Sequence, residues 1–364
     1  MAAGLCLALA AVQAAAAGAS PAGAEPDVEW LLGARRVRHN DAMPLAAMDR
    51  DDHSRIAARP GRNLAYLDDE VRLQRRSGPW SFAVVGRSLA TLVVDAQTLQ
   101  LARLIETRQQ PAADTLWRTE ARLRGFSGAG LEIRRCADVT PQLRAEFSAQ
   151  LLSLGSWHER EIAGSASYDA RSRKYDFAIA SDEIFNRLNF EYRQGPARNG
   201  WGLLGGLELE WSDERMTLRG AVHDGGRLSW NRVPRQTLRL QADRQGTDAD
   251  GFVVYGPLLE GRNSQPSAQR AQPWRARAEA AYRMGRQAQA HAGFDWLADF
   301  GALPWLGASA SLGDMRAAAA WRLHERRLDA SLHWRGLSLG LGLDRLDGNA
   351  RSRSLALGWR WPMP

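Results

Sequence analysis

Residues Pro304–Trp361 decide the fold and read PWLGASASLGDMRAAAAWRLHERRLDASLHWRGLSLGLGLDRLDGNARSRSLALGWRW. The segment divides into pieces in which apolar and polar residues alternate. Within Leu328–Trp334, one parity is entirely apolar and the other entirely polar. Because successive side chains of a strand point to opposite faces, each piece predicts a strand with one apolar face. Breaks such as Gly313-Asp314 and Arg335-Gly336 predict tight turns between antiparallel neighbours.

The same alternation continues backwards almost to residue 26. It predicts about fourteen strands, an even number, as single-chain bacterial barrels have. Short connections alternate with long ones, so the two kinds are expected at opposite ends of the fold. The predicted long loops are residues 41–62, 96–115, 158–199 and 231–272, and a short amphipathic helix is expected within 96–110. The later connections are short, which predicts a lopsided rim.

A closed barrel is the one arrangement in which strands can cross lipid, because every backbone N–H and C=O must be paired there. We therefore predict an all-β fold, an antiparallel up-and-down transmembrane β-barrel with short periplasmic turns and long extracellular loops. A soluble β-sandwich or solenoid is the alternative, although no repeat of fixed length indicates a solenoid. Tryptophans near strand ends predict aromatic belts at the membrane interfaces. The predicted belt residues are Trp117, Trp201, Trp211, Trp274, Trp296, Trp321, Trp334, Trp359 and Trp361.

The last predicted strand resembles the C-terminal assembly signal of bacterial outer-membrane β-barrel proteins. The matching residues are Ser354, Ala356 in place of the usual Gly, Trp359 and Trp361. Three residues follow the last aromatic, which departs from the pattern. The resemblance is to the architectural class and covers residues 26–361. It implies the outer membrane of a Gram-negative bacterium, with membrane lipids and the barrel-assembly machinery as partners.

The N-terminus predicts export by a Sec-type route. Residues 1–24 form an Ala/Leu-rich run that ends in Ala22-Gly23-Ala24, which is typical of a signal peptide and leaves residues 25–364 as the barrel. No Lys or Arg precedes Arg35, although signal peptides usually begin with positive charge. No later stretch is long and apolar enough to predict a transmembrane helix. Removal of the signal leaves Cys136 without a partner for a disulfide.

The formal charge is +7, and the cations are almost all Arg, since Lys174 is the single Lys. The arginines are spread through strands rather than clustered, which argues against nucleic-acid binding. Two interpretations of the polar face stay open: cross-strand ion pairs that keep a lumen polar, or an Arg-rich pore that favours anions. The arginines expected to line the pore are Arg72, Arg87, Arg118, Arg122, Arg124, Arg134, Arg219, Arg275, Arg277 and Arg322.

Catalytic motifs are weak. Omptin proteases use acidic and Asp-His pairs at the barrel rim, but here Asp49–His53 is one short segment, which favours a solvated loop. His333 shares a face with Ser331 and Asp329, yet such spacing on one strand does not build a triad. We expect no metal, no cofactor and no catalytic residue.

The sequence therefore predicts a porin-like outer-membrane channel or transporter for small solutes, with anions and amphiphiles as the candidates. A barrel that exports or displays a surface molecule is one alternative. A hydrolase with its site at the rim is the other.

Overall fold

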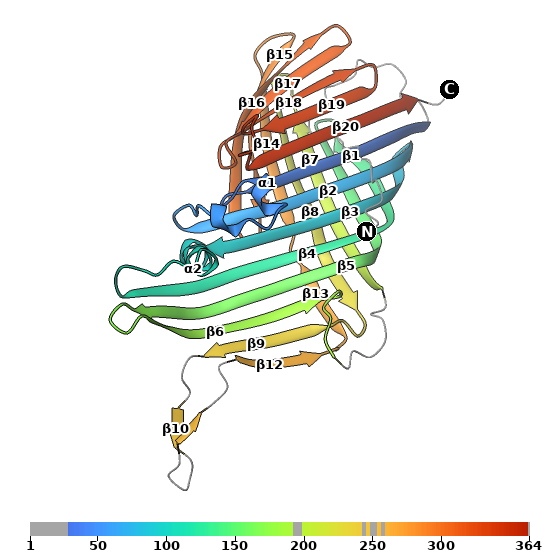
Figure 1. Ribbon diagram of the computed structural model, residues 1–364. Coiled ribbons are helices and arrows are strands. Elements are labelled where there is room, and N and C mark those ends of the chain that lie inside the picture. The colour runs from blue at the N-terminus through green and yellow to red at the C-terminus, as the bar shows by residue number, and fades with distance from the viewer. Residues whose placement is uncertain (1–27, 192–198, 242–244, 248–252, 256–258, 363–364) are drawn as a thin grey trace.

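The computed structural model describes residues 28–191, 199–241, 245–247, 253–255 and 259–362, so the predicted signal peptide lies outside the described residues. The elements appear in Figure 1. They are β1 (Val28–Asn40), α1 (Leu45–Met48), the 3-10 helix η1 (His53–Arg55), β2 (Arg62–Ser77), β3 (Trp80–Asp95), α2 (Ala96–Glu106), β4 (Thr115–Thr140), β5 (Leu143–Asp169), β6 (Lys174–Phe185), β7 (Gly200–Ser212), β8 (Met216–Trp230), β9 (Arg235–Gln241), β10 (Gln245–Thr247), β11 (Val253–Tyr255), β12 (Leu259–Ser264), β13 (Ala268–Gln272), β14 (Arg275–Arg283), β15 (Ala288–Leu297), β16 (Gly301–Leu312), β17 (Met315–Arg322), β18 (Arg327–Trp334), β19 (Leu337–Leu343) and β20 (Ser352–Pro362).

Fourteen of these strands close into an antiparallel barrel, which confirms the predicted fold class. Their order around the barrel is β1, β2, β3, β4, β5, β7, β8 and then β14 to β20. The barrel closes where β1 pairs with β20, from Glu29 opposite Pro362 to His39 opposite Ser352. Closure removes the free edges that an open sheet would expose.

The two ends of the barrel differ, as the connection lengths predict. At the turn end, neighbouring strands are joined by short turns such as 78–79 and 313–314, and β1 begins and β20 ends there. The loop end carries the longer connections. β4 and β5 have 26 and 27 residues, whereas β17 and β18 have 8 each. At about 3.3 Å per residue, β4 is roughly 85 Å long and must project beyond the barrel.

The projecting halves of β4 and β5 carry the barrel sheet beyond the wall, where it continues through β6, β9 and β12, and we call this part the extension sheet (Figure 1). β5 pairs with β7 up to Leu154 and with β6 from His158 onward. A bulge at Gly155 lies between these two pairings. Because a bulge adds one residue to a strand and bends it, Leu154 and Trp157 both face the interior, on either side of the bend. Strands therefore occupy much of the predicted loops 158–199 and 231–272.

The predicted helix within 96–110 is α2, and it lies against the extension sheet rather than in the lumen. Asp95 caps its first turn by accepting a hydrogen bond from the Gln97 backbone N–H at 2.7 Å. Its buried Leu101 packs on Trp117, Ala166 and Tyr168. Among the described residues, no helix has the length and apolar character needed to span a membrane.

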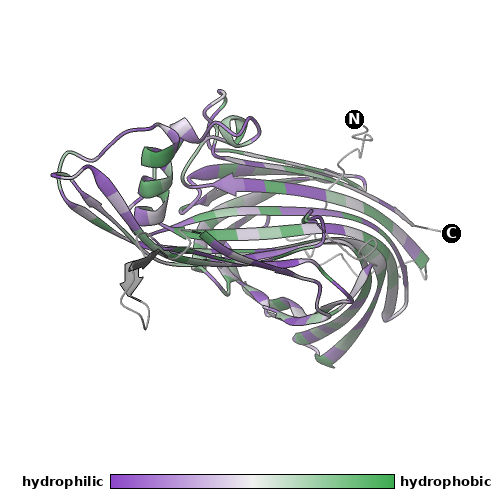
Figure 2. Cartoon of the chain, turned by 60° about the horizontal axis from the view of Figure 1, so that its bottom comes forward, coloured by the Kyte–Doolittle hydropathy of each residue, from purple (hydrophilic) through white to green (hydrophobic). Residues whose placement is uncertain are grey.

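The barrel wall is apolar outside and charged inside. Phe82, Val84 and Leu131 expose more than half of their surface, whereas Arg87 and Glu132 are 6% and 3% exposed. Figure 2 shows this alternation of hydrophobic and hydrophilic residues along the strands. Such a pattern is the reverse of a water-soluble protein and is typical of a barrel surrounded by lipid.

Two glycines of the barrel wall should differ in how well they tolerate substitution by alanine. A Cβ added at Gly130 of β4 would overlap the Leu151 carbonyl oxygen of β5, whereas nothing lies within 4 Å of a Cβ at Gly86 of β3. Backbone atoms cannot move aside, so Gly130→Ala should destabilise the barrel by about 1–3 kcal/mol. The measurement is the temperature at which the fast-migrating folded band converts to the unfolded band on gels. Gly86→Ala is the control, and equal melting of the two variants would contradict the predicted contact.

Candidate functional site: a cavity in the barrel lumen

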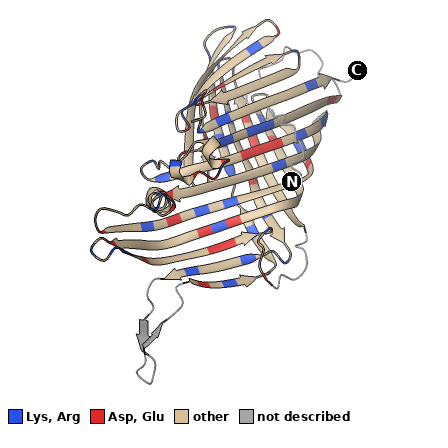
Figure 3. Ribbon diagram, viewed as in Figure 1, with Lys and Arg blue, Asp and Glu red and all other residues tan. Residues whose placement is uncertain are grey.

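The barrel encloses a cavity of about 450 Å³ that is lined by strands from all around the wall. Cavities of this size hold one small organic molecule. Half of its charged residues come from β2, β8 and β14, and the others come from β1, β3, β4, β7, β15, β17 and β18. Figure 3 shows how the charged residues recur along the strands of this side of the barrel.

One group of ion pairs crosses the lumen, and we call it the cross-lumen network: Arg35, Asp68, Arg87, Asp224 and Arg275. Arg275 on β14 contacts Asp68 on β2, with 2.8 Å between Nη1 and Oδ2, and Asp224 on β8, with 2.6 Å between Nη2 and Oδ2. β2 and β14 lie six strands apart around the barrel of fourteen, so this contact spans the interior. Arg87 on β3 completes the bridge, with 2.5 Å between its Nη1 and Asp224 Oδ1, and Arg35 contacts Asp68.

A second group lies nearer the turn end: Glu70, Arg72, Glu132, Arg134 and Glu146. Arg72 Nη1 lies 3.0 Å from Glu132 Oε1, and Arg134 Nη1 lies 2.7 Å from Glu146 Oε1. The Glu70 carboxylate joins the two groups, since it lies 3.5 Å from Arg87 Nε. Together the groups contain five arginines and five acids, so their formal charges cancel. Buried charges are tolerated in this way only when each has a partner.

At the loop end, opposite walls of the barrel touch through apolar side chains. Leu64 on β2 and Val93 on β3 pack against Leu303 on β16. Phe300, in the turn between β15 and β16, packs against the same cluster. Arg62 donates hydrogen bonds to the backbone oxygens of Asp299 and Phe300 at 3.1 and 2.9 Å. The lumen is therefore narrowed in two places: by the apolar contact at the loop end, and by the cross-lumen network between that contact and the turn end.

The structure separates the ten predicted pore arginines into two sets. The seven that line the cavity are Arg72, Arg87, Arg134, Arg219, Arg275, Arg277 and Arg322. The other three are Arg118, Arg122 and Arg124 of β4. Arg118 lies beyond the end of β3, whereas Arg122 and Arg124 pair with the last residues of β3 on one side and with the projecting half of β5 on the other. Arg122 and Arg124 reach Asp299 across the barrel mouth, at 3.4 and 3.1 Å. Arg35 and Arg327, which are not among those ten, also line the cavity.

Eight of the nine predicted belt tryptophans lie in two rows on the barrel strands. The row at the loop end consists of Trp201, Trp274, Trp296 and Trp321, and the row at the turn end of Trp211, Trp334, Trp359 and Trp361. Six of them are exposed, and Trp211 and Trp361 are half-buried. Trp117 is the exception: it is 2% exposed because α2 covers it. It therefore belongs to the core of the extension sheet and not to an exposed belt.

The residues of the predicted assembly signal all lie in β20. Ser354 and Ala356 face the cavity, where Ser354 Oγ donates to Asp329 at 2.9 Å. Trp359 is exposed on the outside, and Trp361 stacks on Trp30 of β1 with 6.4 Å between the ring centroids. The predicted signal therefore coincides with the strand that closes the barrel.

Neither weak catalytic motif assembles into a reactive group. His53 lies in η1 and is exposed, and Asp49 pairs with Arg38 at 3.4 Å. Asp329 is bound by other partners than His333, since Arg322 Nε and Arg327 Nε donate to its carboxylate at 2.6 and 2.7 Å. These contacts therefore do not support the alternative of a hydrolase at the rim.

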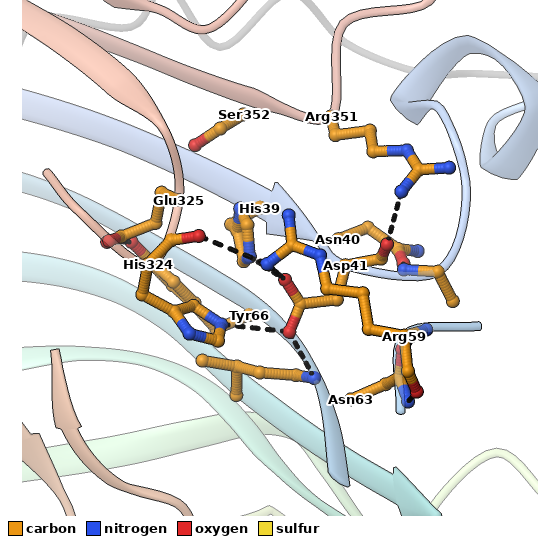
Figure 4. Close-up of polar contacts among 12 residues, drawn as sticks. His39, Asn40, Asp41, Arg59, Asn63, Tyr66, His324, Glu325, Arg351 and Ser352 are labelled. Atoms are coloured by element: carbon orange, nitrogen blue, oxygen red, sulfur yellow. Dashed lines mark hydrogen bonds and ion pairs between the residues drawn. The ribbon is translucent and has the colours of Figure 1, made fainter. Parts of the chain in front are cut away.

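A cluster at the loop end was not predicted: His39 of β1, Asp41 directly after β1, and His324 in the turn between β17 and β18 (Figure 4). His39 Nε2 lies 3.0 Å from Asp41 Oδ1, and His324 Nε2 lies 2.9 Å from Asp41 Oδ2. Burial alone would raise the pKa of Asp41, but hydrogen bonds to both histidines and to the Leu64 backbone N–H hold that pKa well below its usual range. Asp41 is therefore ionised at neutral pH.

No protein-family profile matches the sequence, and the search of curated proteins finds no similar sequence. Solved structures similar to the chain include three outer-membrane barrels. The Pseudomonas putida toluene transporter TodX has 10% identity and a TM-score of 0.41, covering 93% of this chain and 89% of that one. A Pseudomonas aeruginosa FadL homologue has 11% identity and a TM-score of 0.34, with coverages of 92% and 88%. The Escherichia coli outer membrane protease OmpT has 10% identity and a TM-score of 0.24, with coverages of 93% and 95%. The assignment of the fold rests on the strand pairing of this chain itself.

Proposed function

We propose that this protein is a gated outer-membrane channel or transporter that passes one small amphiphilic solute at a time, with anionic amphiphiles favoured. The observation that carries the proposal is the cavity, which combines paired arginines with apolar side chains inside a barrel whose outer surface is apolar. A lipid-embedded barrel with a ligand-sized lumen is suited to moving a solute along its axis.

The location follows from the outer surface. Two rows of tryptophan bound an exposed apolar wall, and such rows lie at the two membrane interfaces in barrels of the Gram-negative outer membrane. The predicted route is Sec-type export followed by insertion through the barrel-assembly machinery. The residues that support that partner lie in β20, the strand that closes the barrel on β1: Ser354, Ala356, Trp359 and Trp361.

The preference for an amphiphile follows from the lining. Nine arginines and seven acids line the cavity, which leaves a small excess of positive charge. Arg277 lies farther from its nearest carboxylate than the other lining arginines do, at 3.5 Å to Glu279 and 3.9 Å to Asp295. Its guanidinium lies 5.0 Å from the centre of the Trp305 ring, so a cation and an apolar surface adjoin. An anionic head group and a short apolar tail match this pair.

A gate is required because the lumen is narrowed in two places. The cross-lumen network would have to separate, and the contact of Leu64 and Val93 with Leu303 would have to open. The extension sheet supports the alternative, a barrel that exports or displays a surface molecule, because it projects beyond the loop end. A polymer would not pass a 450 Å³ cavity crossed by ion pairs without a much larger rearrangement.

The gate predicts the effect of removing Arg275. In Arg275→Ala, Asp224 keeps Arg87 and Asp68 keeps Arg35, so neither acid is left without a partner. The link between β2 and β14 is lost, and the Arg87–Asp224 pair between β3 and β8 remains as the weaker closure. We expect more frequent channel openings in planar bilayers, by about tenfold if the link contributes roughly 1.4 kcal/mol to the closed state. Arg283→Ala, at the exposed turn end of the same strand, is the control. A variant as silent as the unmodified protein would contradict the gate.

The cavity predicts that a large side chain will block solute passage. Ala318 lines the cavity, whereas its neighbour Ala317 is exposed on the outer face. We expect Ala318→Trp to reduce uptake of dodecyl sulfate into proteoliposomes at least about tenfold, because the indole fills space that the solute needs. Ala317→Trp should leave uptake unchanged.

The head-group preference is tested in the same assay. Uptake of dodecyl sulfate should exceed uptake of dodecyltrimethylammonium. Equal uptake of the two would remove the anion preference and keep the channel. Equal uptake by the two Trp variants would contradict passage through the lumen.

A further inference from the structure

The cluster of His39, Asp41 and His324 joins two distant parts of the loop end. His39 and Asp41 follow one another at the end of β1, while His324 comes from the turn between β17 and β18. The one ligand atom that each residue offers lies within 4.8 Å of the other two. His39 and Asp41 are 1% and 0% exposed, so their positions are fixed by the fold. Figure 4 shows both imidazoles directed at the one carboxylate.

These three side chains form a common set of ligands for a transition metal. Imidazole nitrogens and a carboxylate oxygen bind Zn²⁺ at about 2.0–2.2 Å, and sites with two histidines and one carboxylate leave the fourth position open. Ligand atoms around a tetrahedral ion lie roughly 3.3 Å apart, as those bond lengths require. The present separations need only a small movement, which the partly exposed His324 in its short turn can make.

Two buried polar atoms beside the cluster have no hydrogen-bond partner among the described residues: His39 Nδ1 and Glu325 Oε2. Glu325 is 1% exposed, its other oxygen accepts a hydrogen bond from Tyr66 Oη at 2.9 Å, and it interacts electrostatically with His39. A metal-bound histidine usually donates its second ring N–H to a carboxylate or carbonyl. Glu325 can supply that acceptor when His39 Nε2 binds an ion, and both orphaned atoms then gain a partner.

Two guanidinium groups oppose a cation here: Arg351 Nη1 donates to the Asp41 backbone oxygen at 2.7 Å, and Arg59 binds the carboxylate itself. The Arg59 contact is the one that an ion must replace. Arg59 Nη1 lies 2.5 Å from Asp41 Oδ1 and 3.0 Å from the His324 backbone oxygen. The guanidinium of Arg59, which belongs to the loop after β1, thus provides the positive charge that an ion would provide. Its side chain is 27% exposed, so it can turn toward solvent when an ion takes its place.

We propose that His39, Asp41 and His324 bind one divalent transition-metal ion of the Zn²⁺ class, in competition with the guanidinium of Arg59. The ion ties the β17–β18 turn to the end of β1 and so secures the loop-end closure of the lumen. This consequence for the gate rests on the proposed function, whereas the binding of the ion does not.

Cobalt titration of the full-length folded barrel in detergent, after treatment with EDTA, tests the site. We expect one Co²⁺ per chain, visible absorption bands of a tetrahedral site with nitrogen and oxygen ligands, and loss of those bands when Zn²⁺ is added. His324→Ala should abolish the bands. His53→Ala, which removes an exposed histidine of the neighbouring loop, should leave them unchanged.

Arg59→Gln supplies a gain of binding that a misfolded variant cannot mimic. Removal of the competing charge should raise the affinity for Co²⁺ by about tenfold or more. Unchanged affinity would overturn the competition, and absent bands in both the unmodified protein and Arg59→Gln would overturn the site. Bands that persist in His324→Ala would show an adventitious ion only.

The readouts are separate from those of transport. Failure of cobalt to bind leaves the uptake of dodecyl sulfate as it was, and a barrel that passes no solute can still bind the ion. If the ion secures the closure, 10 µM Zn²⁺, on the order of a weak site's Kd, should reduce channel openings in the unmodified protein and not in His324→Ala. Equal openings with and without Zn²⁺ would remove the gating role and keep the site.

Discussion

The contact of Arg275 with Asp68 and Asp224 constrains the rest of the barrel. A buried charge without a partner costs several kcal/mol, so β2, β8 and β14 must hold positions in which the three side chains meet. That requirement brings opposite walls close together and sets the size of the cavity beside them. The apolar contact of Leu64 with Leu303 then becomes possible at the loop end. The two narrowings of the lumen share β2, which carries both Asp68 and Leu64, so a shift of this strand would affect both.

The extension sheet depends on the same geometry. β5 leaves the barrel wall at the Gly155 bulge, where it exchanges β7 for β6 as its neighbour, whereas β4 stays paired with β3 up to Ala121. Arg122 and Arg124 of β4 connect this part of the sheet to the other side of the barrel mouth, because both form ion pairs with Asp299. Asp299 and Phe300 belong to the turn that also closes the loop end. Movement of this turn would therefore change the contacts of both the extension sheet and the proposed gate.

The sequence predicts the barrel well because its signal is local. In Leu328–Trp334, the alternation assigns each side chain to a face without knowledge of its neighbours, and the structure confirms the assignment. The alternation does not indicate where along a strand the membrane ends. Trp117 and Arg118 alternate like barrel residues, yet they lie beyond the rim, where α2 replaces lipid as the apolar cover. The cluster of His39, Asp41 and His324 could not be predicted from the sequence, since Asp41 and His324 are 283 residues apart and closure of the barrel brings them together.

Composition is a poor guide to the potential inside the lumen. The excess of arginine over acid in the chain suggests a strongly positive pore, but the two central groups of ion pairs contain equal numbers of each. A solute would meet the charges that pairing leaves available, and Arg277 beside Trp305 is the best example, because its nearest carboxylate is the most distant among the lining arginines. A solute that binds there does not have to break the network first. Its head group can then compete for Arg275 at short range, where a second anion weakens the link to Asp68. In the proposed channel, this arrangement of charges would couple solute binding to opening of the gate.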